Sequence, residues 1–133
     1  MYFGFAASHM LSLRHQNKTV KKWRILTTHG ASNSRTPGGA INAIENMKKS
    51  FFQDCFIQGH NHRLSDDIET TLYQKNGHLV NRYEWLGSSG SFLKTYVQDT
   101  IGYGEEKLYS PLVLGFLTGV FTKDKMWLYK NLY

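Results

Sequence analysis

The sequence predicts an α/β protein in which one βαβ unit is followed by β-hairpins. Three observations predict this class: a β-rich run ends in a histidine and a glycine, a helix-like apolar period follows it, and the period changes from 3.6 to 2 residues beyond Ser65. A chain of 133 residues with 41% hydrophobic residues is large enough to bury a core. We therefore expect a single domain over residues 1–133.

The βαβ unit is expected in the first half of the chain. Residues 23–28 are rich in β-forming side chains and stop at Gly30, which predicts a strand with His29 at its carboxyl end. Small and turn-forming residues at 31–39 predict a loop, and the apolar residues of 40–52 recur near a helical period. Residues 54–58 are short and apolar, which predicts a buried second strand.

The second half is expected to be mostly β-structure. Lys75, Asn76 and Gly77 separate two β-rich runs, which is typical of a hairpin. Residues 90–98 predict a further strand, and 102–112 an irregular loop. Residues 112–133 predict a terminal hairpin.

The net charge of +6 is concentrated at one end of the chain. Residues 1–44 contain six Lys and Arg side chains and no Asp or Glu, and the first carboxylate is Glu45. Such a basic segment attracts phosphate groups in nucleic acids or small substrates, and it is equally typical of a solvated strand and turn. Both interpretations remain open at this point.

Composition excludes several classes of site. The single Cys55 excludes an internal disulfide framework and a four-cysteine zinc site, and its apolar neighbours indicate a buried thiol. The apolar run at 112–121 is about half the ~20 residues that a transmembrane helix needs. We therefore expect no membrane segment and a cytoplasmic location.

The strongest chemical motif is the run from Gly59 to His62, which follows the predicted buried strand directly. Parallel strands joined by a right-handed crossover end at the same edge of a sheet, so His60 and His62 should converge with His29 there. Three imidazoles favour a transition metal over calcium or magnesium.

The order THG, helix, short buried strand and GHNH resembles the closing motifs of the calcineurin-like metallophosphoesterases. Residues 87–97 and 102–116 are also similar to phage-type and bacterial phosphoesterases and to members resembling DNA repair exonucleases. The resemblance implies the carboxyl-terminal half of a layered β-sandwich flanked by helices. It further implies two divalent transition metals (Mn, Zn or Fe), with His29 and His60 on one and His62 on the other, and a phosphomonoester or phosphodiester substrate, nucleic acid included.

The earlier motifs of that family are missing. Its Asp-x-His, Gly-Asp and Gly-Asn-His-Asp or Gly-Asn-His-Glu segments do not occur before His29. We therefore assign no catalytic residue and expect an incomplete domain that lacks its amino-terminal half, with only partial metal occupancy. A split gene product, a truncated reading frame and a decayed remnant are all consistent with this, and a separate chain is the expected source of the missing half. Asp66 and Asp67 are expected to cap the next turn and balance Arg63.

Two other functions compete with a phosphoesterase fragment. One is a non-catalytic nucleic-acid-binding module that uses the basic first third, and the other is a mononuclear metal-binding protein without activity. We interpret the scattered Trp and Tyr residues as sheet packing. We interpret residues 87–91 as a tight strand junction, and His9, His15 and His78 as surface residues.

Overall fold

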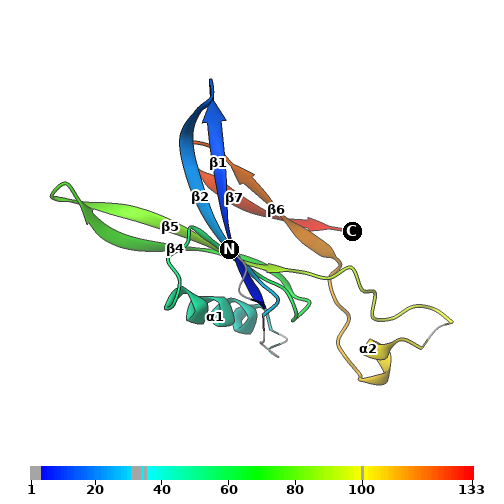
Figure 1. The fold of residues 1–133 in the computed structure, drawn as a ribbon. Helices are drawn as coiled ribbons and strands as arrows, with labels where there is room; N and C mark the ends of the chain where they lie inside the picture. The colour runs from blue at the N-terminus through cyan, green and yellow to red at the C-terminus, as the bar shows by residue number, and fades with distance from the viewer. Residues whose placement is uncertain (1–3, 31–33, 35, 100) are drawn as a thin grey trace.

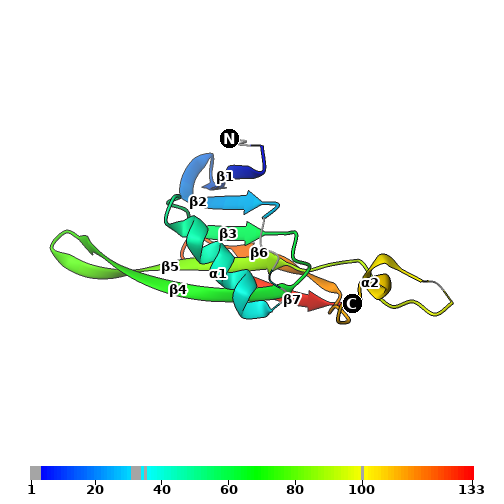
Figure 2. The same ribbon diagram turned by 90° about the horizontal axis from the view of Figure 1, so that it is seen from below.

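The computed structural model describes residues 4–30, 34, 36–99 and 101–133. Its main feature is a five-stranded sheet with the order β1-β2-β3-β5-β4. The central strands β2, β3 and β5 run parallel to one another, and the edge strands β1 and β4 are antiparallel to their neighbours (Figure 2). The strands are β1 (Ala6–His15), β2 (Lys18–Thr28), β3 (Cys55–Gln58), β4 (Leu64–Lys75) and β5 (His78–Ser89).

Each face of this sheet is covered by a different element. The helix α1 (Pro37–Lys48) crosses one face, and the hairpin of β6 (Gly115–Phe121) and β7 (Met126–Leu132) packs on the other (Figures 1 and 2). The predicted α/β class, the β2-α1-β3 unit and the terminal hairpin are therefore confirmed.

The two cores follow from the alternation of side chains along the strands. Leu26, Phe56 and Leu86 are aligned across β2, β3 and β5 and pack against α1. The row that precedes them includes Cys55 and Trp85, and it packs against the β6–β7 hairpin. One-residue alternation thus supplies both faces of the central strands with apolar side chains.

The helix begins earlier than predicted. Thr36 accepts a hydrogen bond of 3.1 Å from the backbone N–H of Gly39, and Pro37 occupies the first helical turn. Thr and Pro are favoured at these two positions because the hydroxyl satisfies a free N–H and proline lacks one. Residues 37–39, the end of the segment predicted as a loop, are therefore the first turn of α1. Of the rest of that predicted loop, the structure describes only Ser34 and Thr36.

The β4–β5 hairpin forms as predicted, with Asn76 and Gly77 both at positive φ in its turn. The strand predicted at residues 90–98 is wrong. Gly90 turns the chain away from the sheet at φ +81°, and Ser91 makes an isolated bridge with Leu114. β-forming residues need a partner strand, and the segment leaves the sheet before it meets one. The expected loop at 102–112 holds a single helical turn, α2 (Tyr103–Glu106).

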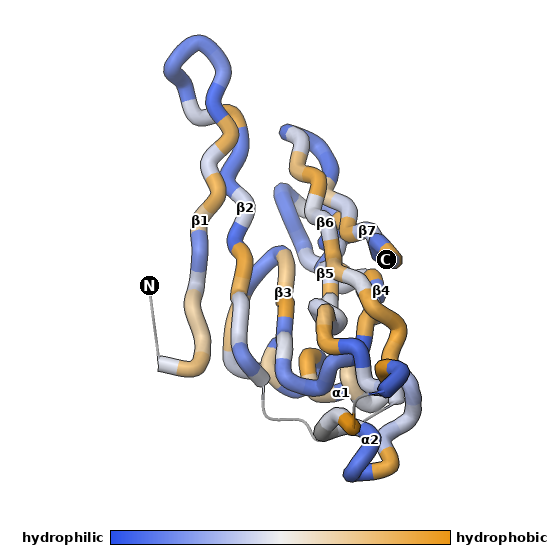
Figure 3. Tube along the Cα trace, turned by 90° about the vertical axis from the view of Figure 1, so that its right-hand side faces the viewer, coloured by the Kyte–Doolittle hydropathy of each residue, from blue (hydrophilic) through white to orange (hydrophobic). Residues whose placement is uncertain are grey.

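The basic amino-terminal segment forms the β1–β2 hairpin, whose far end is hydrophilic (Figure 3). Arg14, Lys18 and Lys22 are exposed there, as expected of a solvated strand and turn. No helix among the described residues is long and apolar enough to cross a membrane.

A chain of ion pairs lies near the amino ends of the parallel strands. Asp54 pairs with Arg24 at 3.1 Å and with Arg82 at 3.4 Å. Arg82 also pairs with the buried Glu84, which contacts Lys48 of α1 at 2.7 Å. These pairs tie β2, β5 and α1 together at the edge opposite His29.

We predict that Asp54→Asn lowers the free energy of unfolding at pH 7 by about 2 kcal/mol, because hydrogen bonds to a charged group are lost. Burial acts to raise the pKa of Asp54, but hydrogen bonds and charge from Arg24, with a bond from Arg82, hold it below its ordinary 3.8. Because the pKa of Asp54 is lower in the folded state than in the unfolded state, its ionised carboxylate stabilises the fold. This stabilisation is complete above pH 3.8 and is lost as the pH falls through the pKa of the folded state.

Urea denaturation at pH 7 and at pH 3 checks this prediction. The difference in the free energy of unfolding between the wild type and Asp54→Asn should be smaller at pH 3 than at pH 7. Asp124→Asn, in the exposed turn between β6 and β7, is the matched control and should change little at either pH. A difference that stays constant with pH would show that the charge of Asp54 is not what stabilises the fold.

Candidate metal site at the carboxyl edge of the sheet

His29 and His60 meet at the carboxyl edge of the parallel strands. Nε2 of His29 and Nδ1 of His60 are 2.9 Å apart, and the ring planes are inclined by 71° with centroids 4.8 Å apart. The convergence follows from the topology, because His29 comes directly after β2 and His60 follows the neighbouring parallel strand β3. Both side chains are exposed, so the pair is accessible to a ligand.

The GHNH loop adopts an uncommon backbone. His60 and His62 have φ values of 70° and 56°, in the left-handed region that costs about 1–2 kcal/mol for a residue with a Cβ. The positive φ values fall on the two histidines and not on Gly59, the one residue of the loop that would adopt them without strain. Strained residues of this kind concentrate at functional sites, since the surrounding structure must hold them in place.

Asn61 holds the loop, a role that the sequence reasoning missed. Its Oδ1 accepts hydrogen bonds from Ser88 Oγ at 2.7 Å and from the Arg63 N–H at 3.2 Å. Ser88 is fully buried at the end of β5, and the N–H of Gly59 donates to the carbonyl of Thr28 at 3.0 Å. The signal available in the sequence was an amide between the two histidines and a serine-rich strand end, both suited to hydrogen bonding.

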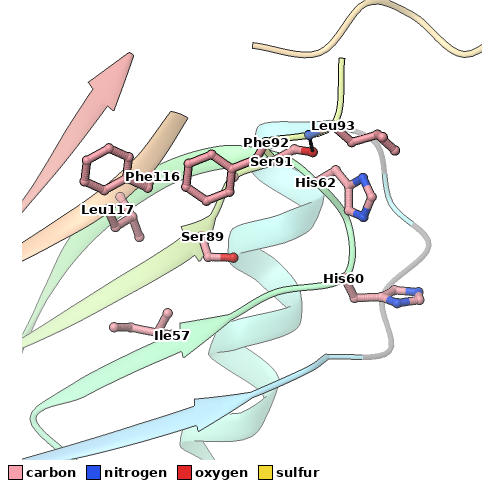
Figure 4. A pocket seen from close by; sticks show the side chains of 10 residues that line it. Ile57, His60, His62, Ser89, Ser91, Phe92, Leu93, Phe116 and Leu117 are labelled. Carbon is pink, nitrogen blue, oxygen red and sulfur yellow. Dashed lines mark hydrogen bonds between the residues drawn. The ribbon is translucent and has the colours of Figure 1, made fainter. Parts of the chain in front are cut away.

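His62 lies near His60 and does not complete a cluster. Both histidines line a pocket of about 430 Å³, and two phenylalanine rings, those of Phe92 and Phe116, lie on its other side (Figure 4). Across the part of the chain that the structure describes, no three His, Cys, Asp or Glu side chains gather into a group that could hold a metal ion. The structure therefore brings His29 and His60 together and places His62 in the adjoining pocket.

The two aspartates that follow the motif do not enter this site. Asp66 lies in β4 and pairs with Lys130 of β7 at 2.7 Å, and Asp67 Oδ1 accepts from the N–H of Ile68. The expectation that they cap a turn is wrong, because both positions are paired with β5 across the sheet.

The structure also tests the interpretations of residues 87–91, of Cys55, of the aromatic residues and of the other histidines. Residues 87–91 form a tight strand junction beside the pocket. Cys55 is fully buried, which together with the charge of Asp54 raises the pKa of its thiol to about 12 and makes it a poor nucleophile. Trp23 and Trp85 are buried and pack edge to face, as expected of sheet packing, whereas Tyr73 of β4 and Tyr129 of β7 are exposed. The histidines outside the motif are exposed: His9, His15 and His78.

The imidazole pair fits a transition metal in its donor chemistry. Two nitrogen ligands of a tetrahedral zinc ion are about 3.3 Å apart when each bond is about 2.0 Å. The 2.9 Å between His29 and His60 is close to that value, and in the metal-free pair one of the two nitrogens must carry a hydrogen. The pair alone supplies fewer donors than a closed site requires, since structural zinc has four ligands and catalytic zinc three.

Comparisons with known proteins give no family assignment. No protein-family model matches the chain, and no curated protein matches it. Among solved structures, the chain is similar to the crystal structure of a Vps29 single mutant from Entamoeba histolytica, with 16% sequence identity and a TM-score of 0.48. The match covers 92% of this chain and 52% of that one, so the chain spans about half its length.

The fold and the site thus define an α/β protein with a histidine pair at the carboxyl edge of its sheet.

Proposed function

We propose that this chain contributes the imidazole part of a metal-dependent phosphoesterase centre of the calcineurin-like kind. The observation that carries the proposal is the contact of 2.9 Å between His29 and His60, formed by exposed residues at the edge where α/β proteins bind their ligands. The strained histidine loop and the polar end of the adjoining pocket support it.

Each histidine has a distinct role in this proposal. His29 and His60 would hold one metal ion, and His62 would be a ligand of the second. A bound divalent metal supplies Lewis acidity, which polarises a phosphoryl oxygen toward attack. Asn61 and Ser88 are positioning residues, because their hydrogen bond fixes the loop that carries His60 and His62.

The centre needs carboxylates that the described residues do not bring to this edge. Three neutral imidazoles leave the charge of two divalent ions largely uncompensated. We propose that a separate polypeptide segment or chain supplies these ligands, and with them the catalytic groups. The domain described here is then the carboxyl-terminal half of a complete centre, whose metals would be Mn, Zn or Fe.

Metal and phosphate titrations of the purified chain test this function. We expect Zn²⁺ or Co²⁺ to bind at one site per chain, with affinity lowered at least about tenfold by His29→Ala or His60→Ala because half of the donor pair is removed. His78→Ala, at the first position of β5, is the matched control and should bind metal like the wild type. Inorganic phosphate should bind only to the metal-loaded chain.

Other outcomes favour the competing functions. Metal uptake without phosphate binding would favour the inert mononuclear metal protein. The nucleic-acid-binding module is supported by the basic end of the β1–β2 hairpin. It would be favoured if single-stranded DNA binds with an affinity that falls steeply with salt and is unchanged by metal and by the histidine variants. Metal binding that survives both histidine variants would overturn the proposed site.

A further inference from the structure

The pocket beside the histidines has two chemically different ends. His60 and His62 form a polar end beside Leu93, and Phe92 and Phe116 form an aromatic end (Figure 4). Ser89 and Ser91 also line the pocket. The volume of about 430 Å³ lies within the usual range of small-molecule sites, about 300–1,000 Å³. A ligand that fills this pocket therefore needs one polar and one apolar part.

The aromatic end has the geometry of a stacking surface. The rings of Phe92 and Phe116 are inclined by only 23° with centroids 6.0 Å apart. Tyr133 packs edge-on against Phe92 at 5.5 Å and supports the pair from the carboxyl terminus. Phe92 nevertheless remains 67% exposed, so much of its ring is free to stack on a ligand.

The backbone holds this aromatic pair beside the histidine loop. The N–H of Gly90 donates to the carbonyl of Arg63 at 3.2 Å, which joins the segment before Phe92 to the residue after His62. The N–H of Gly115 donates to the carbonyl of Ser91 at 3.0 Å, which brings Phe116 to the same place. These two hydrogen bonds therefore fix the aromatic end next to the histidine loop.

We propose that Phe92 and Phe116 form a base-binding platform and that the phosphoester taken by this site is a nucleotide. This inference rests on the proposed function, since the phosphate is assigned to the end formed by His60 and His62. The planar base stacks on the exposed phenylalanine rings, because a base and an aromatic ring attract each other face to face. The hydroxyls of Ser89 and Ser91 also line the pocket, and they can hydrogen-bond to the polar sugar.

Calorimetric titration of the zinc-loaded chain with adenosine 5′-monophosphate and with ribose 5-phosphate tests the platform. We expect the nucleotide to bind at least about fivefold more tightly than the sugar phosphate. Phe92→Leu should abolish this preference and leave the affinity for ribose 5-phosphate and for zinc unchanged. Phe116→Leu is the second variant, and Phe5→Leu, at an 83% exposed position outside the pocket, is the matched control.

The outcomes separate this inference from the function on which it rests. Equal affinity for adenosine 5′-monophosphate and ribose 5-phosphate would overturn the platform. A preference for the nucleotide that survives in both Phe92→Leu and Phe116→Leu would overturn it as well. In either case, metal-dependent phosphate binding would still support the proposed phosphoesterase function. Conversely, adenosine that binds the metal-free chain and is lost in Phe92→Leu would uphold the platform even if metal-dependent phosphate binding failed.

Discussion

Replacing Phe56 by alanine is expected to lower the free energy of unfolding by about 3–5 kcal/mol. Phe56 lies in the central strand β3, is fully buried, and packs with Leu26, Ile44 and Leu86 between the sheet and α1. Truncation removes the transfer free energy of the ring and leaves a cavity that the flanking strands prevent from closing. Domains of this size have a free energy of unfolding of about 5–15 kcal/mol, so this loss is a large fraction of the total stability.

Urea denaturation followed by circular dichroism measures this loss. The matched control is Phe5→Ala, because Phe5 is 83% exposed and its truncation should change stability by less than about 0.5 kcal/mol. Similar losses in both variants would contradict the assignment of Phe56 to the core. A large loss should also reduce metal binding, since β3 carries the loop with His60 at its end.

Local patterns predict the elements whose partners lie nearby in the sequence. The β2-α1-β3 unit could be predicted because strand-like and helix-like periods follow one another there, and the β4–β5 hairpin because Asn76 and Gly77 suit a tight turn. Residues 90–98 have the same β-rich composition and form no strand. Their conformation depends on whether a partner strand is present, which composition does not reveal.

The candidate site divides in the same way. The meeting of His29 and His60 could be predicted, because adjacent parallel strands end at one edge. The position of His62 depends on a φ of 56° and on the bond from Ser88 to Asn61, which is formed across a gap of 27 residues. The pairing of Phe92 with Phe116 likewise requires the chain to leave the sheet and return, so no local spacing indicates it.

Gly90→Ala is expected to lower the free energy of unfolding by about 3 kcal/mol and to disrupt the pocket. Gly90 has φ +81°, which disfavours any side chain. A Cβ at this position would also lie 2.5 Å from the carbonyl oxygen of Gly115 and 3.1 Å from Leu64 Cδ1. The first of these contacts is with backbone, which cannot rotate away as a side chain does.

Gly77→Ala separates the two causes of this loss. Gly77 has nearly the same φ, +80°, but a Cβ there would meet no atom within 4 Å. It should therefore show only the conformational cost of about 1–2 kcal/mol. Urea denaturation measures the loss in free energy of unfolding for both variants. The loss in Gly90→Ala minus the loss in Gly77→Ala is the cost of the contact with Gly115. Equal losses would contradict the contact between residues 90 and 115.

The backbone must separate in Gly90→Ala because the opposite side of the contact has no room to yield. A Cβ on Gly115 would itself lie 2.1 Å from the carbonyl oxygen of Asn131, so Gly115 is held between Gly90 and β7. Relief by outward movement of residue 90 would carry Phe92 away from Phe116 and lengthen the bond from the Gly115 N–H to Ser91. Gly90→Ala should therefore lose the preference for adenosine 5′-monophosphate over ribose 5-phosphate under conditions in which it is still folded, and Gly77→Ala should keep it.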